Sequence, residues 1–286
     1  MKVERIIPYG YCNGVNHAFA VINEAINNRN CKKIYLFGRP IHNEFAVNEL
    51  ISKGLIIINN ESELENVENG SIVVFPAHGH LKHLDQIAER KKLVVYDAIC
   101  PFIRNNVNKI IKKINCDEIV LLLGDKNHIE IKSILSISDN VYLLDKEILK
   151  KYQNNTNNKI SLFVQSTLDK NDLSAKIKDI QDSIPSINIE DAFVCNATSE
   201  RQNALKQIPS SCDLIIVIGD KTSNNTNKLF ELAKSLFPHI ETVFISCRQE
   251  LDSRVLENKK HVVLTSGAST PKYLVDDVFD YLINAN

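Results

Sequence analysis

The chain has 286 residues and carries 34 Lys and Arg residues against 35 Asp and Glu residues, so its formal net charge is −1. A chain this close to neutral lacks the positive field with which proteins bind nucleic acid through its phosphates. Hydrophobic residues make up 44% of the chain and charged residues 24%, which is typical of a folded globular protein and excludes a disordered one. No run of about 18 apolar residues predicts a membrane-spanning helix. The first residues resemble a strand and not a secretion signal, so we expect a cytoplasmic protein without a membrane partner.

Short apolar runs alternate with stretches of helical periodicity along the whole chain. Apolar residues recur at helical spacing in Val15–Ile26 and again in Thr226–Leu236. This alternation of strands and helices predicts an α/β fold with mostly parallel sheets. The predicted strands are, in chain order, Lys33–Phe37, Ile72–Phe75, Leu93–Tyr96, Glu118–Leu123, Ile160–Val164, Leu214–Ile218, Thr242–Ile245 and His261–Leu264.

Three cysteines mark an internal repeat. Cys12, Cys100 and Cys195 each follow an extended run and precede a predicted helix, at spacings of 88 and 95 residues. A strand that ends in glycine follows each of them, and in the second and third copies Asp-Lys follows that glycine. Because units this small are marginal alone, we predict three similar α/β units packed around a pseudo-threefold axis. Their expected bounds are 13–99, 100–193 and 194–286, with the N-terminal strand 1–12 on the third unit.

Polar residues of the repeat fall where a ligand site is expected. Parallel sheets bind ligands at the carboxyl ends of their strands, and the three cysteines and six polar loop residues all lie at such ends. Around a pseudo-threefold axis the three thiols would converge at the centre, with the polar side chains around them. A centre surrounded by His and Ser suits an anionic, oxygen-rich ligand. The six polar residues are His42, His78, His128, Ser166, Ser223 and Ser269.

Three converging thiolates predict a metal centre. They could hold zinc, with a histidine as fourth ligand, or a 4Fe–4S cluster with one iron left open. Each cysteine precedes a helix, and a helix N-terminus stabilises the thiolate that binds metal. The chain has seven cysteines and no C-x-x-C pair, so we expect neither a disulfide framework nor a zinc ribbon. A zinc protein and a non-catalytic iron–sulfur sensor stay open alternatives on these grounds. We expect ordinary structural roles for Cys31, Cys116, Cys212 and Cys247.

Nine short motifs occur in an order and at gaps that match one enzyme family. On these motifs the chain resembles the IspH/LytB family of 4-hydroxy-3-methylbut-2-enyl diphosphate reductases over essentially its full length. No single motif is decisive, but nine in this order are highly specific. The motifs are GYCNGV (Gly10–Val15), IHNE (Ile41–Glu44), AHG (Ala77–Gly79), DAICP (Asp97–Pro101), NHIE (Asn127–Glu130), QST (Gln165–Thr167), CNATSERQ (Cys195–Gln202), KTSNNTNKL (Lys221–Leu229) and SGAS (Ser266–Ser269).

The resemblance implies an iron–sulfur oxidoreductase of the non-mevalonate isoprenoid pathway. Such an enzyme converts (E)-4-hydroxy-3-methylbut-2-enyl diphosphate to isopentenyl diphosphate and dimethylallyl diphosphate, with ferredoxin or flavodoxin as electron donor. Cys12, Cys100 and Cys195 would bind one 4Fe–4S cluster per chain, leaving one iron open. Glu130 would deliver protons, and Ser166 would hydrogen-bond near Glu130 and the substrate hydroxyl. The residues implied to bind the diphosphate are His42, His78, His128, Ser223, Asn225 and Ser269.

This sequence departs from the family's usual pattern at a few positions. Asn224 stands where a second serine is common, and because an amide still donates hydrogen bonds we keep it among the substrate-binding residues. His80 follows the AHG motif where a small apolar residue is common, and Asn105 replaces a typical lysine. Two other functions stay open: a 4Fe–4S-dependent lyase or dehydratase, and a diverged paralogue that acts on another anionic substrate. Dependence on an external reductant separates the reductase from the lyase.

Overall fold

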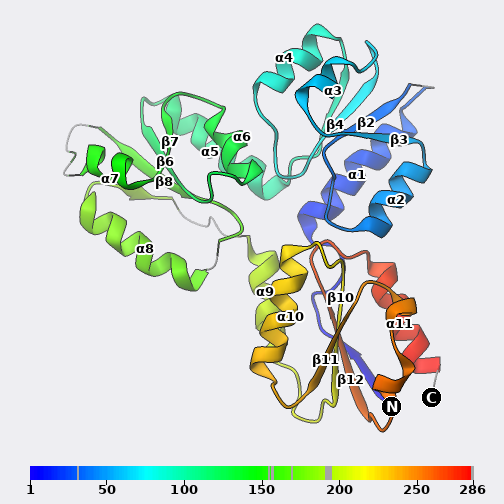
Figure 1. The fold of residues 1–286 in the computed structure, drawn as a ribbon. Coiled ribbons are helices and arrows are strands. Elements are labelled where there is room, and N and C mark those ends of the chain that lie inside the picture. Colours follow the sequence, from blue (N-terminus) through cyan, green and yellow to red (C-terminus); the bar gives the residue numbers. More distant parts are fainter. Residues whose placement is uncertain (31, 154, 156–157, 169, 191–194, 285–286) are drawn as a thin grey trace. The chain divides into compact units, whose positions relative to one another are not determined.

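The structure is a computed structural model that describes residues 1–30, 32–153, 155, 158–168, 170–190 and 195–284 (Figure 1). Internal contacts divide the chain into two compact units. Unit 1 consists of Met1–Asn16, Arg39–Leu55 and Asn196–Asn286, and unit 2 of His17–Gly38 and Ile56–Cys195. None of the helices in the described ranges is long and apolar enough to cross a membrane.

The strands of the described residues form three four-stranded sheets, which confirms the predicted α/β fold with parallel sheets. The expected bounds of the three units and their packing around an axis stay predictions. The first sheet has the spatial order β3 (Leu55–Ile58), β2 (Ile34–Phe37), β4 (Ile72–Phe75) and β5 (Val94–Asp97). The second has the order β7 (Val141–Leu143), β6 (Ile119–Leu123), β8 (Ile160–Val164) and β9 (Asn188–Ile189). The third has the order β1 (Lys2–Arg5), β12 (His261–Ser266), β10 (Leu214–Ile218) and β11 (Glu241–Ile245).

Helices connect the strands, as expected for parallel sheets. With the first sheet, in chain order, come α1 (Asn13–Asn27), α2 (Glu44–Ser52), α3 (Glu61–Glu65) and α4 (His83–Arg90). With the second come α5 (Pro101–Ile114), α6 (Ile129–Leu135), α7 (Lys146–Tyr152) and α8 (Lys170–Ser183). With the third come α9 (Asn196–Leu205), α10 (Asn224–Leu236), the short 3-10 turns η1 (Arg248–Glu250) and η2 (Ser253–Leu256), and α11 (Lys272–Asn284).

The sequence did not predict β3, β7 or β9. All three are edge strands of two to four residues. With three and two residues, β7 and β9 are too short for an alternating or continuous apolar pattern to stand out from a loop. β3 is as long and as apolar as the predicted strand β4, so its length does not explain why it was missed. The inner strands β4, β8, β10 and β12 are buried along their whole length, and such continuous apolar runs are what a sheet covered on both faces produces.

The third sheet shows how this burial arises. Alternate residues of β10 point to opposite faces, so Ile216 packs with Val275 and Val278 of α11. Its neighbour Val217 packs in a second cluster with Leu229 of α10. Figure 1 shows α9 and α10 on one side of this sheet and α11 on the other. Two apolar layers therefore enclose β10 and fix the end of this strand, where the loop 219–223 begins.

Candidate active site

The three cysteines of the repeat stand directly before helices, as the sequence predicts. Helices α1, α5 and α9 begin at the residue after Cys12, Cys100 and Cys195, respectively. All three cysteines are partly exposed, and none forms a disulfide. The positive end of a helix dipole lies next to each thiol, which favours the thiolate.

The backbone amide of each cysteine is anchored in the same way. The amide of Cys12 donates to the carbonyl of Ala268 at 3.0 Å, and that of Cys100 to the carbonyl of Ala77 at 2.8 Å. The amide of Cys195 donates to the carbonyl of Ser166 at 2.7 Å. Each acceptor follows an inner strand and either is a predicted site residue or directly precedes one. The fold thus ties every cysteine to a polar loop of the preceding repeat, and Cys12 to a loop of the last.

These cysteines are chemically suited to an iron–sulfur cluster. Three partly exposed thiols at helix starts provide the donor set that such a cluster requires. Cys12 belongs to unit 1, and Cys100 and Cys195 belong to unit 2. Among the residues that the structure describes, no three His, Cys, Asp or Glu side chains form a group that could hold a metal ion. The convergence of the three thiols therefore stays a prediction.

Glu130 is a buried carboxyl in unit 2, with only 2% of its surface exposed. The Ser166 hydroxyl donates to one of its oxygens at 2.6 Å, and the Ser166 amide donates to the other at 2.9 Å. Burial raises the pKa of Glu130 above its ordinary value, although the two Ser166 hydrogen bonds and the charge of His128 oppose this effect. A buried carboxyl of this kind retains a proton to higher pH than an exposed one and can donate it in a closed site.

His128 lies beside Glu130 as the N-cap of α6. The Glu130 amide donates to Nδ1 of His128 at 3.3 Å. Because Nδ1 accepts this hydrogen bond, the neutral ring carries its hydrogen on Nε2. Nε2 of His128 is thus a hydrogen-bond donor that the cap of α6 does not use. The structure brings the predicted residues His128, Glu130 and Ser166 together in unit 2.

Gln165 is a supporting residue that the sequence analysis did not single out. Its Oε1 accepts from the Asp125 amide at 2.9 Å, and its Nε2 donates to the Thr167 hydroxyl at 2.7 Å. The side chain is buried and joins the loop after β6 to the loop after β8. The signal in the sequence was its place in the QST motif next to Ser166.

His78 follows β4 and lies in the same loop as the anchor of Cys100. The residue is partly buried, and its Nδ1 is 3.3 Å from the carbonyl oxygen of Gly79. Gly79 has a φ of +86°, and a Cβ at this position would lie 2.7 Å from the Ser133 hydroxyl. Only glycine fits this turn without displacing a neighbour, so the glycine of the AHG motif also has a steric origin.

Three predicted residues of unit 1 are joined by hydrogen bonds of serine hydroxyls, His42 through its backbone carbonyl. Ser223 caps α10 by accepting from the Thr226 amide at 3.4 Å. Its hydroxyl lies 3.3 Å from that of Ser269, and the Ser269 hydroxyl donates to the His42 carbonyl at 3.2 Å. The loops that precede α2, α10 and α11 therefore come together within unit 1. Helix N-termini with hydroxyl donors are a common arrangement for binding anions.

Asn224 and Asn225 open helix α10 next to Ser223. Asn224 is exposed and Asn225 is partly buried. Behind them, Thr226 fills the space beside Gly267, where an added Cβ would lie 2.0 Å from the Thr226 hydroxyl oxygen. Gly267 therefore allows the loop of Ser269 to approach the start of α10 closely.

Arg201 supports the Cys12 loop and was also not singled out from the sequence. It is 4% exposed, and its Nη2 donates to the Gly10 carbonyl at 2.7 Å. Its Nη1 donates to the Ala197 carbonyl of the same helix at 2.9 Å. Gly10 has a φ of +76° and donates its amide to the Ser266 hydroxyl at 2.8 Å. The backbone before Cys12 is thus held on both sides.

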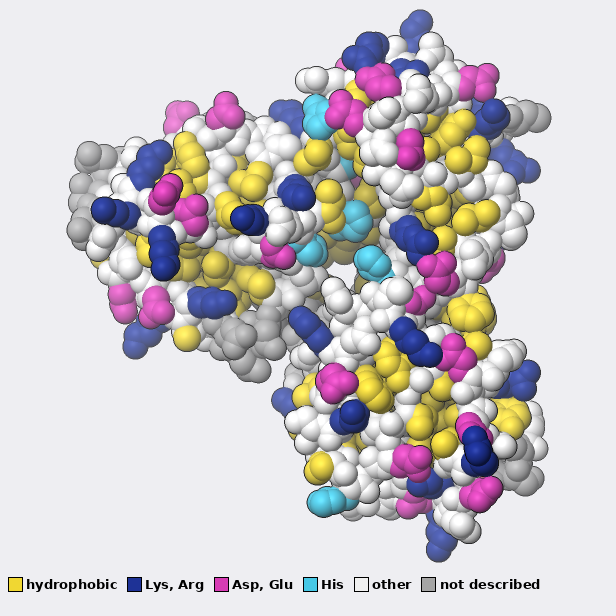
Figure 2. All heavy atoms as spheres, in the orientation of Figure 1, with side chains coloured by type: hydrophobic (Ala, Val, Ile, Leu, Met, Phe, Trp, Pro, Cys, Tyr) yellow, Lys and Arg dark blue, Asp and Glu magenta, His cyan; other side chains and the backbone are white. Residues whose placement is uncertain are grey.

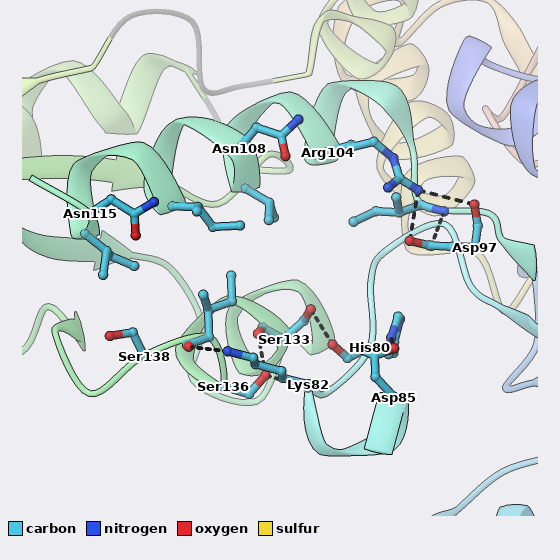
Figure 3. A pocket seen from close by; sticks show the side chains of 15 residues that line it. His80, Lys82, Asp85, Asp97, Arg104, Asn108, Asn115, Ser133, Ser136 and Ser138 are labelled. Atoms are coloured by element: carbon cyan, nitrogen blue, oxygen red, sulfur yellow. Dashed lines mark hydrogen bonds and ion pairs between the residues drawn. The ribbon is translucent and has the colours of Figure 1, made fainter. Parts of the chain in front are cut away.

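A separate cavity of about 520 Å³ lies along α5 in unit 2 (Figure 3). Arg104 pairs with Asp97 at 2.9 Å, and His80 Nε2 lies 2.8 Å from Asp85. The Lys82 ammonium donates to the Ile137 carbonyl at 3.3 Å. Within the described ranges, none of the predicted cluster, proton-donor or substrate-binding residues lines it. Its apolar wall consists of Ile99, Val107, Ile111, Ile114 and Ile137.

The charges on the surface follow the near-neutral composition. On the face shown in Figure 2, Lys and Arg side chains are interspersed with Asp and Glu side chains. No part of that face carries an extended area of one sign.

Comparison with known proteins gives one consistent result. The family model described as LytB protein matches residues 3–283. The 4-hydroxy-3-methylbut-2-enyl diphosphate reductase of Macrococcus caseolyticus is 32% identical over 289 residues, which cover 99% of this chain and 89% of that protein. The protein of the same name from Symbiobacterium thermophilum is 31% identical over 292 residues, which cover 100% of this chain and 98% of that protein.

Solved structures share the fold as well. The E-1-hydroxy-2-methyl-but-2-enyl-4-diphosphate reductase from Plasmodium falciparum has a TM-score of 0.80 at 28% identity, covering 99% of this chain and 88% of that one. A structure of (E)-4-hydroxy-3-methyl-but-2-enyl diphosphate reductase, described as the terminal enzyme of the non-mevalonate pathway, has a TM-score of 0.78 at 26% identity, covering 99% and 100%. The similarity extends over nearly the whole chain in both sequence and structure.

Proposed function

Because this chain belongs to the LytB protein family, we propose that it is a reductase of (E)-4-hydroxy-3-methylbut-2-enyl diphosphate. The reaction takes two electrons and two protons. One proton leaves with the allylic hydroxyl as water, and the other ends on carbon, giving isopentenyl or dimethylallyl diphosphate according to the carbon that receives it. A redox protein of the ferredoxin or flavodoxin class is the proposed electron donor, and the cytoplasm is the proposed location.

The observation that carries this proposal is the buried pair of Glu130 and Ser166. A hydroxyl leaves as water only when it receives a proton, and Glu130 is the group suited to supply it, because burial raises its pKa. Ser166 fixes both carboxyl oxygens of Glu130 through its amide and its hydroxyl. A fixed donor needs no reorganisation when the proton moves.

The loops of unit 1 provide donors for the diphosphate in this proposal. Ser223 and Ser269 lie within hydrogen-bonding reach of each other, and α10 begins at the next residue after Ser223. Asn224 and Asn225 add side-chain amides at the same helix start. His42, His78 and His128 are proposed as further donors to the phosphate oxygens.

A 4Fe–4S cluster is the proposed cofactor, held by the thiolates of Cys12, Cys100 and Cys195. When bound, such a cluster supplies electrons one at a time and has one iron without a protein thiolate. The thiols fit this role because each lies at a helix N-terminus and each backbone amide is anchored to a strand-end loop. The bond between the Cys195 amide and the Ser166 carbonyl also connects one proposed ligand directly to the proton donor's partner.

Anaerobic turnover tests the proposed function. The protein is reconstituted with iron and sulfide, given the substrate and reduced methyl viologen, and assayed by dye oxidation. We expect substrate-dependent oxidation, and a loss of at least about 100-fold in kcat for Glu130→Gln, because general acid catalysis contributes a factor of this order. Glu231→Gln, on the exposed side of α10, is the matched control and should keep the wild-type rate.

The outcome distinguishes the reductase from the lyase. Consumption of substrate with equal rates in the presence and absence of the reductant would assign a lyase. A reconstituted protein with a full complement of iron that neither oxidises the dye nor consumes this substrate would contradict the proposed reaction and favour a paralogue with another anionic substrate.

A further inference from the structure

Asp220 is a buried acidic residue among the loops of unit 1. It follows Gly219 at the end of β10 and is 7% exposed. Its Oδ1 accepts from the Thr222 amide at 2.8 Å and from the Thr222 hydroxyl at 2.6 Å. Its Oδ2 accepts from the Glu44 amide at 2.8 Å. A carboxylate in a region proposed to bind a diphosphate requires an explanation, because it would repel that anion.

The second oxygen of Asp220 joins two loops that are 176 residues apart in sequence. Glu44 is the first residue of α2, and its amide belongs to the loop that carries His42. Asp220 lies in the loop that carries Ser223. The bond from the Ser269 hydroxyl to the His42 carbonyl supports the same arrangement. Without the Asp220 bond, this part of the His42 loop would lose a charge-assisted hydrogen bond to the third sheet.

The charge of Asp220 is compensated within the protein. Burial by itself would raise the pKa of Asp220, but the hydrogen bonds from Thr222 and Glu44 and the positive charge of His42 outweigh it and lower the pKa. The carboxylate thus stays ionised and accepts three hydrogen bonds from the protein, two at Oδ1 and one at Oδ2.

The second repeat contains an internal comparison. Asp125 follows Gly124 just as Asp220 follows Gly219, and its Oδ1 likewise accepts from the amide two residues later, that of Asn127, at 2.9 Å. Asp125, however, is exposed. In the described part of the chain its carboxylate bonds to no other loop. The two residues therefore share the local turn, and only Asp220 adds a bond to a distant loop.

We propose that Asp220 is a positioning residue, whose Oδ2 holds the His42 loop against the Ser223 loop and so sets the spacing of the groups that bind the diphosphate. The inference rests on the proposed function for the identity of the anion. It predicts a result opposite to simple electrostatics, because removal of a negative charge would otherwise strengthen anion binding.

Four variants isolate the bond between the loops. Asp220→Asn keeps one acceptor oxygen for the Thr222 turn but puts an NH2 group in place of the other oxygen. Glu44→Pro removes the donor from the opposite side, and proline is tolerated there because Glu44 is the first helical residue and Asn43 before it is extended, with φ −156° and ψ 110°. Asp125→Asn makes the same chemical change in the second repeat. Glu44→Ala keeps the amide but removes the carboxylate that pairs with Arg39.

Calorimetric binding of inorganic pyrophosphate to the reconstituted protein is the first measurement. We expect Kd to rise about tenfold in Asp220→Asn and in Glu44→Pro, the loss expected for one charge-assisted hydrogen bond. The variant that combines Asp220→Asn with Glu44→Pro should show about the same tenfold rise in Kd, because the two substitutions remove the same hydrogen bond. Asp125→Asn and Glu44→Ala should stay within about twofold of the wild type. In turnover, KM for the substrate should rise in the first two variants, with kcat changed less.

Each possible result supports or overturns the positioning role of Asp220. Unchanged or tighter pyrophosphate binding in Asp220→Asn would overturn the proposal, as would equal losses in Glu44→Ala and Glu44→Pro. If Asp220→Asn does not fold, Glu44→Pro tests the same bond. A wild-type protein that binds no pyrophosphate would overturn both this inference and the diphosphate site. Pyrophosphate binding that depends on Asp220, without turnover of the proposed substrate, would support the positioning role and refute only the proposed reaction.

Discussion

Opposing effects act on single carboxyl groups in this protein. Glu130 and Asp220 are both buried and both accept hydrogen bonds from neighbouring donors. For Glu130 burial prevails and the pKa is raised, whereas for Asp220 the donors and the charge of His42 prevail and the pKa is lowered. Asp220 accepts hydrogen bonds from three donors, which explains its lowered pKa. Glu130 accepts from only two donors and is more deeply buried, which explains its raised pKa. A buried carboxyl group is thus suited to proton donation at Glu130 and to loop positioning at Asp220.

The raised pKa of Glu130 predicts how its removal affects stability. The unfolded chain ionises this group near its ordinary pKa of about 4.3, and the folded chain ionises it at higher pH. Between these values the folded state binds more protons, so the stabilising contribution of the protonated group is complete at low pH and is lost as the pH rises through the folded pKa.

We therefore expect Glu130→Gln to have a higher melting temperature than the wild type at pH 8. The difference should shrink as the pH approaches 4. Thermal unfolding of the unreconstituted protein followed by circular dichroism measures it, with Glu231→Gln as the control. A difference in melting temperature that is constant over this pH range would contradict the interpretation of Glu130 as a destabilised carboxylate.

Individual elements owe their position to burial on both faces of the sheets. In β10, Ile215 and Ile216 are both fully buried, yet they belong to different apolar clusters on opposite sides. By contrast, Val95 in the edge strand β5 is 43% exposed. The loop with Asp220 and Ser223 begins where β10 ends, so the packing of this strand determines where the loop starts.

Truncation of β10 tests this packing. We expect Ile215→Ala and Ile216→Ala each to lower the free energy of unfolding by about 2–5 kcal/mol, since each leaves a cavity in a separate core layer. Val95→Ala should cost less than about 1 kcal/mol because its side chain is already partly in solvent. Urea unfolding monitored by circular dichroism gives these values. A small effect for only one of the two isoleucines would mean that one face of the sheet is not tightly packed.

The helix starts show a second feature at this scale. The same residues that begin helices also bear the proposed chemistry: Cys100 precedes Pro101, while His128 and Ser223 cap their helices. Residues at these positions have amides and side chains directed toward the loops, where an anion or a thiolate is stabilised by the helix dipole. Ordinary capping and ligand binding thus use one geometry.

For the molecule as a whole, the repeat determines how distant segments are connected. The amides of Cys100 and Cys195 each bond to a loop of the repeat before them, and the amide of Cys12 bonds to a loop of the last repeat. Units 1 and 2 are each assembled from separate stretches of the chain. The backbone of each of these three cysteines is therefore anchored by a loop that is distant from it in the sequence.

Iron content tests whether the three cysteines act together. After anaerobic reconstitution we expect about four irons per wild-type chain, and a loss of most of that iron in each of Cys12→Ser, Cys100→Ser and Cys195→Ser. Cys116→Ser, at an exposed position, should retain the wild-type content. Iron and sulfide analysis gives the result. Full iron in any of the three single variants would remove that residue from the proposed ligands.

Much of the fold was predictable because it depends on local patterns. The inner strands are continuous apolar runs, and helices α1, α5 and α9 begin directly after the three cysteines of the repeat, so the parallel α/β fold could be inferred. Edge strands such as β9, with two residues, could not, because their stability comes from a neighbouring strand and not from their own pattern. The candidate residues His128, Glu130 and Ser166 were named from motifs, and the structure brings them into contact.

The sequence by itself determined the fold class, the three cysteines of the repeat and the family, because residue type, periodicity and motif order are properties of the chain. Only the tertiary structure decided which groups support the site. Gln165, Arg201 and Asp220 have partners 40 to 191 residues away, and no local pattern specifies such pairs. The lowered pKa of Asp220 was equally hidden, since it depends on the donors that surround this carboxyl after folding.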